Sequence, residues 1–256
     1  MMRIEDFKVL SNKRITGDYF ILDLLAPGDL PDILPGQFVQ LRVDNSKETF
    51  LRRPISVYDV DYSNNVLSLL IKEVGPATKA MGRLDNGMTV NLVYPLGNHY
   101  STGPAGERSL LLGGGVGVAP LLLLGRHLSN KSLPFRFLLG YQSADQLIEE
   151  KRFAAYGEVL ISTDDGSYGY KGFVTEHPEL HGDDYERIYC CGPEPMMKAV
   201  AAIAQKKGKF CEVSLENTMA CGYGVCLCCV VETHRGNINT CTEGPVFNVR
   251  ELKWQT

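Results

Sequence analysis

The first 189 residues of this 256-residue chain contain no cysteine, although the whole chain contains eight. A disulfide framework normally accompanies a secretion signal, and the N-terminal sequence has no apolar signal-peptide core. All eight cysteines follow Tyr189, and five of them lie between Cys221 and Cys241 inclusive. Clustered cysteines without a secretion signal indicate metal or redox chemistry rather than structural disulfides.

The sequence also lacks runs of like charge and long apolar segments. Its 26 basic and 30 acidic residues give a net charge of −4, with no basic stripe that could bind nucleic acid. The longest strongly apolar segment, 110–124, is interrupted by four glycines and a proline and is too short to span a bilayer. We therefore expect a cytoplasmic protein that binds neither nucleic acid nor a membrane.

The first hundred residues have the pattern of short strands separated by turns. Segments rich in β-branched, aromatic and leucine residues predict strands at 19–25, 38–43, 56–59, 66–71 and 89–93. Glycine, proline, asparagine and aspartate mark the turns between them. This spacing predicts a small antiparallel barrel, with one helix at 77–84.

From Ser109 onward the pattern alternates buried strands with helices. Strands are expected at 109–112, 135–141, 159–163, 187–191 and 210–215, and helices at 121–128, 146–156 and 194–207. Such alternation predicts a doubly wound parallel sheet. Two short strands, 230–233 and 246–248, are expected near the end of the chain. We divide the chain into a barrel domain at 1–102, an α/β domain at 103–213 and a cysteine-containing domain at 214–256.

The cysteine loop is the most specific motif. Cys221, Cys226 and Cys229 have the spacing C-x4-C-x2-C, and Cys241 follows after eleven intervening residues. Three cysteines so spaced in one loop are the plant-type arrangement of [2Fe–2S] ligands. A structural zinc site with four cysteines normally places them as two separated pairs, so it is the less favoured alternative.

A fifth cysteine, Cys228, is adjacent to Cys229 in this loop. Neighbouring side chains in an extended segment point to opposite sides, so we expect Cys228 to be a buried residue that does not bind metal. Tyr223, Val225 and Leu227 alternate with other loop residues and form an apolar set. They are expected either to contact a partner protein or to pack over the metal site.

Two glycine turns follow predicted parallel strands. The first, 113–120, leads into a helix near Pro120, and the second is the Cys-Gly-Pro segment 191–193. Both would lie at the carboxyl ends of strands, where nucleotides bind to helix N-termini. The first departs from the G-x-G-x-x-G fingerprint, so turns without a ligand are the alternative interpretation.

Arg52 and Arg53 precede Pro54, Ile55 and Ser56 in the barrel half. A guanidinium can bind a pyrophosphate through two parallel hydrogen bonds, and a nearby hydroxyl can reach the edge of a flavin ring. A charged edge strand that contains proline is the alternative.

The order of these motifs resembles the ferredoxin–NADP reductase superfamily, in which a flavin barrel precedes a pyridine-nucleotide domain. The whole chain more closely resembles the electron-transfer subunits of NAD-dependent dihydroorotate dehydrogenase B. The segments that carry this resemblance are 52–56, 113–120, 163–167, 219–226 and 241–247. It implies a multidomain β and α/β fold, with FAD on the barrel, NAD on the doubly wound sheet and a [2Fe–2S] cluster in a small C-terminal domain.

The resemblance also implies the residues of each site. FAD would be bound by Arg53, Pro54, Ile55, Ser56, Leu70, Ile71, Lys72, Gly75, Ala77 and Thr78. NAD would be bound by Gly114, Gly115, Gly117, Cys191, Gly192 and Pro193, with Cys191 either near the nicotinamide or in a packing role and no catalytic residue certain. The metal ligands would be Cys221, Cys226, Cys229 and Cys241. Ile55 replaces a tyrosine of the superfamily signature, and Ala77 stands where we expect glycine.

The implied function is that of an oxidoreductase subunit in pyrimidine biosynthesis. Dihydroorotate would be oxidised on a catalytic partner subunit that carries FMN, within a heterotetramer of two plus two subunits. Electrons would pass through the cluster to FAD and then to NAD⁺. The segment 141–146 has no basic residue and contains Asp145, which favours NAD over NADP. The alternatives are a reductase subunit that serves a ferredoxin, glutamate-synthase-like or hydrogenase partner, and a zinc-stabilised interaction module without enzymatic activity.

Overall fold

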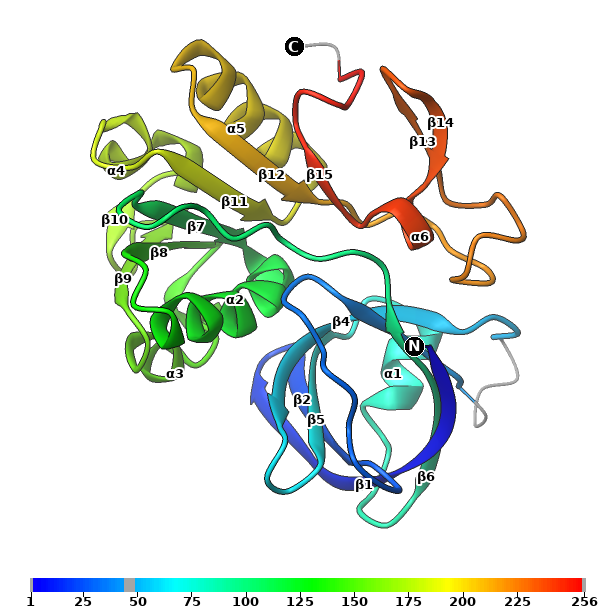
Figure 1. Cartoon of the computed structure of the whole chain (residues 1–256). Coiled ribbons are helices and arrows are strands. Elements are labelled where there is room, and N and C mark those ends of the chain that lie inside the picture. Colours follow the sequence, from blue (N-terminus) through cyan, green and yellow to red (C-terminus); the bar gives the residue numbers. More distant parts are fainter. Residues whose placement is uncertain (1, 44–48, 255–256) are drawn as a thin grey trace.

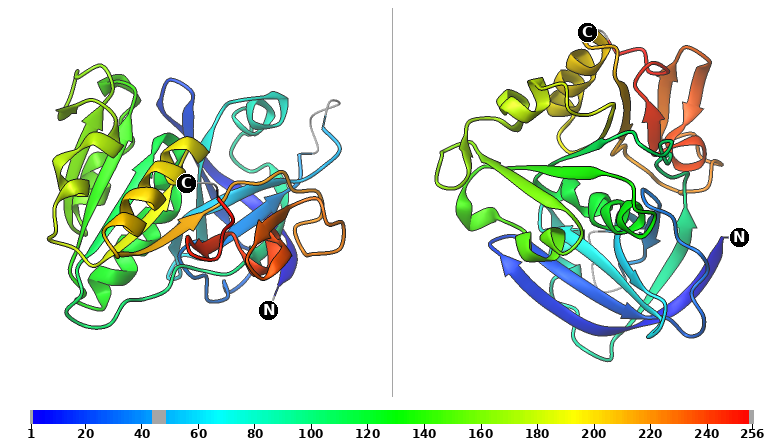
Figure 2. Two further views of the ribbon diagram at one scale, coloured as in Figure 1. Left: turned by 90° about the horizontal axis from the view of Figure 1, so that it is seen from above. Right: turned by 60° about the vertical axis from the view of Figure 1, so that its left-hand side comes forward.

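The computed structural model describes residues 2–43 and 49–254. An N-terminal barrel lies below a mostly parallel sheet, and a small C-terminal hairpin region lies beside both (Figures 1 and 2). None of the helices in these two ranges is long and apolar enough to cross a membrane.

Six antiparallel strands close into the barrel in the order β1-β2-β5-β4-β3-β6. They are β1 (Arg3–Thr16), β2 (Tyr19–Leu25), β3 (Phe38–Leu41), β4 (Arg53–Asp61), β5 (Val66–Lys72) and β6 (Thr89–Leu96), with α1 (Pro76–Met81) between the last two. Alternate side chains such as Phe7, Leu22 and Leu69 fill the interior. The predicted antiparallel barrel is confirmed.

Strand β1 is absent from the expected strands because its sequence is strongly charged. Only Phe7 and Val9 of its 14 residues are buried. The strand nevertheless closes the barrel by pairing with β2 on one side and β6 on the other. Pairing with these two strands, one adjacent and one distant in the sequence, determines the conformation of β1.

The second sheet has seven strands in the order β10-β9-β8-β7-β11-β12-β15. They are β7 (Ser109–Gly114), β8 (Phe135–Tyr141), β9 (Glu158–Thr163), β10 (Tyr170–Lys171), β11 (Arg187–Cys191), β12 (Phe210–Ser214) and β15 (Val246–Asn248). All are parallel except β15, which pairs antiparallel with β12. Helices cover both faces, so the predicted doubly wound sheet is confirmed (Figure 1).

The helices α2 (Ala119–Asn130) and α3 (Glu150–Ala154) cover the face toward the barrel, and α4 (Pro178–His181) and α5 (Glu194–Lys206) cover the other face (Figure 1). The helix expected at 146–156 is limited to α3. Leu147 is extended and Glu149 has a left-handed conformation with φ of 36°, so a helix cannot pass through them.

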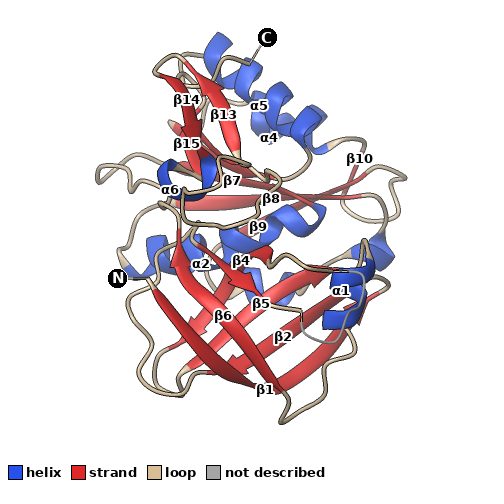
Figure 3. Ribbon diagram, turned by 90° about the vertical axis from the view of Figure 1, so that its right-hand side faces the viewer, coloured by secondary structure: helices blue, strands red, loops and turns tan. Residues whose placement is uncertain are grey.

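Helix α2 is shared by the barrel and the sheet (Figure 3). Leu123 belongs to the buried core of the barrel, whereas Leu121 and Leu124 belong to the core of the sheet. The run of leucines in this helix is apolar on every side because both neighbours bury it.

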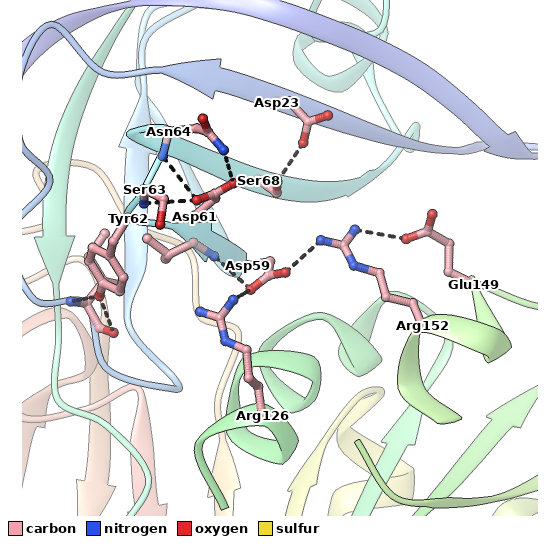
Figure 4. A network of polar contacts seen from close by, with 12 residues as sticks. Asp23, Asp59, Asp61, Tyr62, Ser63, Asn64, Ser68, Arg126, Glu149 and Arg152 are labelled. Atoms are coloured by element: carbon pink, nitrogen blue, oxygen red, sulfur yellow. Dashed lines mark hydrogen bonds and ion pairs between the residues drawn. The ribbon is translucent and has the colours of Figure 1, made fainter. Parts of the chain in front are cut away.

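A buried carboxylate also joins the barrel to the helices of the sheet (Figure 4). Asp59 on β4 is 9% exposed and forms ion pairs with Arg126 of α2 at 2.5 Å and Arg152 of α3 at 2.7 Å. Arg152 also pairs with Glu149 at 3.1 Å and lies over the ring of Tyr58. This network fixes the position of the barrel relative to the sheet.

The C-terminal region contains the hairpin β13 (Val230–Thr233) and β14 (Gly236–Asn239), followed by α6 (Thr240–Glu243) and β15. The loop between β12 and β13 reaches toward the barrel (Figures 1 and 2). Phe38, Val93 and Leu96 of the barrel form one buried cluster with Met219, Cys229 and Cys241. The cysteine loop is therefore packed directly against barrel strands β3 and β6.

Candidate functional site

A cavity of about 420 Å³, here called the central cavity, lies where the barrel, the sheet and the C-terminal segment meet. Eight of the ten residues predicted to bind FAD line it: Arg53, Pro54, Ile55, Ser56, Leu70, Ile71, Lys72 and Thr78. Val116 and Ala119 line it from the sheet, and residues 214–219 line it from the segment that leads to the cysteine loop. The structure thus brings most of the predicted FAD residues together.

The two adjacent arginines have different roles. Arg52 donates hydrogen bonds to the carbonyl oxygens of Gln40 at 3.2 Å and Asn91 at 3.0 Å, so it ties β3 to β6. Arg53 lines the central cavity, and its guanidinium donates to the carbonyl oxygens of Leu51 and Arg52. Arg53 is therefore the arginine that is positioned to bind an anionic group in the cavity.

The remaining two predicted FAD residues lie at the start of α1, Gly75 as the residue before the helix and Ala77 within its first turn. The hydroxyl of Thr78 accepts hydrogen bonds from the amides of Val74 at 2.9 Å and Gly75 at 3.1 Å. Thr78 lines the central cavity, but Gly75 and Ala77 do not, and Ala77 is buried. The turn keeps its capped form with alanine where we expect glycine.

A second cavity of about 430 Å³, here called the sheet cavity, lies at the carboxyl ends of the parallel strands. Gly114, Gly115 and Pro193 line it, whereas the other predicted NAD residues, Gly117, Cys191 and Gly192, do not. Lys72 lines both cavities. The two cavities therefore adjoin at Lys72.

Gly117 and Gly192 act through packing, since they let the two strand-end turns touch. A methyl group on Gly117 would lie 2.5 Å from the carbonyl oxygen of Cys191. Gly192 has φ of 153°, and a methyl group on it would lie 3.0 Å from the amide of Gly114. Only glycine permits this approach, which brings both turns to the edge of the sheet cavity.

Cys191 is completely buried, and burial raises the pKa of its thiol well above the usual value. The hydroxyl of Ser214, which lines the central cavity, interacts with this thiol. The thiol is therefore neutral and packs beneath the wall of the cavity. Its proximity to a nicotinamide stays a prediction.

Asp164 is a cavity residue to which the sequence reasoning assigned no role. It follows β9 and lines the sheet cavity, whereas Asp145 does not. Burial and the charges of Asp165 and Glu176 raise the pKa of Asp164. The available signal was its place in the acidic segment 163–167, directly after a parallel strand.

The four predicted ligand cysteines interact in two pairs. Burial raises the pKa of the Cys221 thiol. Hydrogen bonds from the amides of Tyr223, Cys226 and Val225 and from the Cys226 thiol outweigh this effect and lower the pKa to about 6. Cys229 and Cys241 form the second pair, and burial together with Cys229 raises the pKa of Cys241 to about 12.

Backbone amides also point at the second pair. The amide of Gly224 donates to the sulfur of Cys241 at 3.1 Å, and the amide of Cys241 donates to the sulfur of Cys229 at 3.4 Å. Cys228 is exposed, so the expectation that it is buried is wrong. The preceding residue, Leu227, has φ of 57°, and this reversal turns Cys228 outward while Cys229 is buried.

The paired thiols fit a cluster with two irons. Within residues 2–43 and 49–254, no three His, Cys, Asp or Glu side chains converge closely enough to hold one metal ion. A [2Fe–2S] cluster takes two thiolates on each iron, so two adjoining pairs suit it better than a single tetrahedral zinc ion. The amides directed at the sulfurs also match the hydrogen bonding that such clusters receive.

An apolar wall separates the central cavity from the second cysteine pair. Phe38 and Met219 line the cavity and also pack with Cys229 and Cys241. A ligand in the cavity and a cluster held by these cysteines would therefore be separated by apolar side chains and not by water.

Comparisons with known proteins identify two regions of the chain. A family model described as the iron-sulfur cluster binding domain of dihydroorotate dehydrogenase B matches residues 216–253. A model described as an oxidoreductase NAD-binding domain matches residues 111–202. A dihydroorotate dehydrogenase B (NAD(+)) electron transfer subunit from Lysinibacillus sphaericus is 37% identical, with 96% of this chain and 97% of the relative covered. The chain belongs to this family.

A second member, from Shouchella clausii, is 39% identical over 90% of this chain and 91% of its own length. Among solved structures, one reported as the NADH-dependent reduced ferredoxin-NADP oxidoreductase, studied for flavin-based electron bifurcation, has a TM-score of 0.88 at 28% identity and covers 97% of this chain and 90% of its own. A ferredoxin reductase of carbazole 1,9a-dioxygenase shares the fold, with a TM-score of 0.70 at 21% identity over 81% of this chain and 67% of its own.

These matches confirm that the chain is an oxidoreductase subunit. They also confirm the predicted cofactors, which are FAD, a [2Fe–2S] cluster and NAD. An electron transfer subunit acts together with a catalytic partner subunit, so that part of the partner prediction is confirmed as well.

Proposed function

We propose that this chain carries electrons from the catalytic subunit of dihydroorotate dehydrogenase B to NAD⁺, in pyrimidine biosynthesis. Dihydroorotate is oxidised on the FMN of the partner, electrons enter at the cysteine cluster, and they leave toward NAD⁺ by way of FAD in the central cavity. The observation that carries this proposal is that residues from the barrel, the sheet and the cysteine segment line the same cavity.

The residues of the central cavity bind and orient FAD in this proposal. Arg53 binds the pyrophosphate, and the hydroxyl of Ser56 contacts the edge of the flavin ring. Phe38 and Met219 exclude water between the flavin and the cluster. The chemistry that bound FAD supplies is the conversion between hydride exchange with nicotinamide and one-electron exchange with iron.

The residues of the sheet cavity bind NAD. Backbone amides at Gly114 and Gly115 face the pyrophosphate at the N-terminal end of the turn that leads into α2, and Pro193 adjoins Gly114 at the same edge of the cavity. Lys72 lies at the junction of the two cavities, where nicotinamide and flavin must meet. The junction of the two cavities supports direct hydride transfer between the nicotinamide and the flavin.

The cysteine loop faces the catalytic subunit in this proposal. Tyr223, Val225 and Leu227 are 48%, 74% and 64% exposed, which favours partner contact over packing onto the cluster. The complex is proposed to contain two copies of each subunit, and its mass in solution tests that stoichiometry. A cytoplasmic location is also proposed, because cluster-binding thiols must stay reduced.

The test is anaerobic reduction of the co-expressed complex by NADH and, separately, by dihydroorotate. Optical spectra report the flavins, and electron paramagnetic resonance (EPR) spectra report the reduced [2Fe–2S] cluster. Both reductants are expected to reduce the flavin and the cluster. Failure of dihydroorotate to reduce either cofactor in a fully loaded complex would contradict the proposal.

The similarity to the NADH-dependent reduced ferredoxin-NADP oxidoreductase favours a second candidate function, electron transfer to a ferredoxin-type partner. The same experiment separates the two. Under this second function, NADH but not dihydroorotate reduces the cofactors, and reduced ferredoxin replaces dihydroorotate as the electron donor.

A further inference from the structure

Gln40 is a polar side chain buried in an apolar region beside the cysteine loop. It lies on β3, opposite Val93 of β6, and its exposed fraction is 0%. Val93 packs in the same buried cluster as Cys229 and Cys241. Neither the oxygen nor the nitrogen of the Gln40 carboxamide has a hydrogen-bond partner in the part of the chain that the structure describes.

The carboxamide lies against the backbone between the first two cluster ligands. Gly222 directly follows Cys221, and a methyl group built on Gly222 would lie 2.6 Å from Cγ and 2.8 Å from Nε2 of Gln40. Gly222 also has φ of 81°, a conformation that other residues rarely adopt. Glycine at this position therefore allows the Gln40 side chain to reach the cluster-binding loop.

A buried carboxamide without a partner is unfavourable, so its presence here points to a ligand that completes its hydrogen bonding. Thiolate and sulfide sulfurs of an iron–sulfur cluster accept hydrogen bonds and cannot donate them. The NH₂ group of a glutamine is a donor of the required kind. Gln40 is not among the described residues that line the central cavity, and its side chain lies against Gly222, so a group held by the cysteine loop is the acceptor within its reach.

We propose that Gln40 donates a hydrogen bond from Nε2 to a sulfur of the [2Fe–2S] cluster held by the loop that begins at Cys221. Reduction adds negative charge to the cluster, and a donor directed at sulfur stabilises that charge. Gln40 therefore raises the reduction potential of the cluster and favours electron entry from the partner. This inference deepens the proposed function and rests on it.

The test compares Gln40→Leu with Gln37→Leu in the complex with the catalytic subunit. Both changes remove a glutamine carboxamide from the same part of the barrel. Gln37 is a matched control because its carboxamide is already satisfied by the carbonyl oxygen of Gly97 and the amide of Leu34. The backbone contact of Arg52 with the Gln40 carbonyl oxygen does not depend on the side chain.

The measurement is a redox titration followed by EPR. Gln40→Leu is expected to lower the midpoint potential of the cluster and shift its g values, with iron content and the flavin potentials unchanged. Gln37→Leu is expected to leave the cluster potential at the wild-type value. An unchanged cluster potential in iron-loaded Gln40→Leu overturns the inference, whereas absence of a [2Fe–2S] signal in the wild-type complex overturns the proposed function as well.

Pulsed EPR on the wild-type complex provides a test that does not depend on folding of the variant. With ¹⁵N in the glutamine side chains, the reduced cluster is expected to show a coupling to a side-chain nitrogen. Gln40→Met is expected to remove this coupling. A wild-type complex without the coupling contradicts the hydrogen bond, even if Gln40→Leu fails to assemble.

Discussion

At the scale of single residues, adjacent cysteines in the cluster loop have opposite environments. Cys229 is 2% exposed and pairs with Cys241, whereas Cys228 is exposed. Cys228→Ser is therefore expected to keep the visible absorbance and the iron content of the purified protein, while Cys229→Ser loses both. Iron analysis and the absorption spectrum check this, and loss of the cluster from Cys228→Ser would show that the ligand set is wrong.

Asp164 is expected to disfavour NADPH. Its carboxylate lines the sheet cavity close to Asp165 and Glu176, so a 2′-phosphate placed there would meet like charge. Asp164→Asn is expected to raise the ratio of kcat/KM for NADPH to that for NADH by about tenfold, which corresponds to about 1.4 kcal/mol. Steady-state reduction of a dye with each nucleotide measures this ratio.

Asp145 provides the control for this experiment. It lies on the neighbouring loop after β8 but does not line the sheet cavity. Asp145→Asn is expected to leave the nucleotide preference unchanged. If both variants change the preference equally, general surface charge rather than Asp164 sets it.

At the scale of elements, strands with compact apolar patterns could be predicted from the sequence. The expected bounds of 19–25, 135–141 and 187–191 agree with β2, β8 and β11 to the residue. Neighbouring strands and the side chains packed on the sheets bury these strands, so their own residues carry the apolar pattern that predicts a strand. By contrast, β1 has a charged sequence, and β10 has only two residues, so neither has a pattern of its own.

The candidate site was predictable where spacing along the chain expresses the chemistry. The cysteine spacing indicated the cluster loop, and the glycine turns after β7 and β11 indicated the edge of the sheet cavity. Contacts that depend on the assembled fold gave no such signal. Gln40 and Gly222 are 182 positions apart, and the packing of the cysteine loop against barrel strands β3 and β6 brings them together.

The cluster loop itself is expected to dock on the catalytic subunit. Leu227 in this loop is 64% exposed, so a charge there should disturb an apolar interface without disturbing the core. Leu227→Asp is expected to weaken complex formation by about 2 kcal/mol, or about thirtyfold in Kd. Measured affinity for the purified catalytic subunit checks this prediction.

Leu10→Asp serves as the control for the docking prediction, because Leu10 is 44% exposed on strand β1 of the barrel and lines neither the central cavity nor the sheet cavity. It is expected to leave complex formation unchanged. Full affinity in Leu227→Asp, with the cluster still present, would assign the apolar loop residues a role other than docking.

At the scale of the whole molecule, electron transfer requires the barrel and the sheet to keep a fixed relation. The central cavity draws its walls from both, so a small rotation between them would separate Ser56 from Ala119. Helix α2 and the Asp59 network are the contacts that hold this relation (Figure 4). The cofactor sites are thus properties of the assembled chain and not of any one sheet.

Asp59→Asn tests this relation directly. The amide keeps the shape of the side chain but leaves Arg126 and Arg152 without the carboxylate that pairs with both. Because Asp59 is buried and the arginines are partly exposed, we expect the free energy of unfolding to fall by about 2 kcal/mol. Thermal unfolding should show a decrease in Tm of about 5 °C, and NADH should reduce the flavin more slowly.

Asp61→Asn is the matched control, since Asp61 lies two residues further along β4 and, in the part of the chain that the structure describes, accepts its hydrogen bonds from Ser63 and Asn64 of its own turn (Figure 4). Loss of the Asp61 carboxylate is expected to change Tm only slightly and to leave the rate of flavin reduction by NADH unchanged. If Asp59→Asn lowers Tm while NADH reduces the flavin at the wild-type rate, α2 alone maintains the alignment of the two cavities.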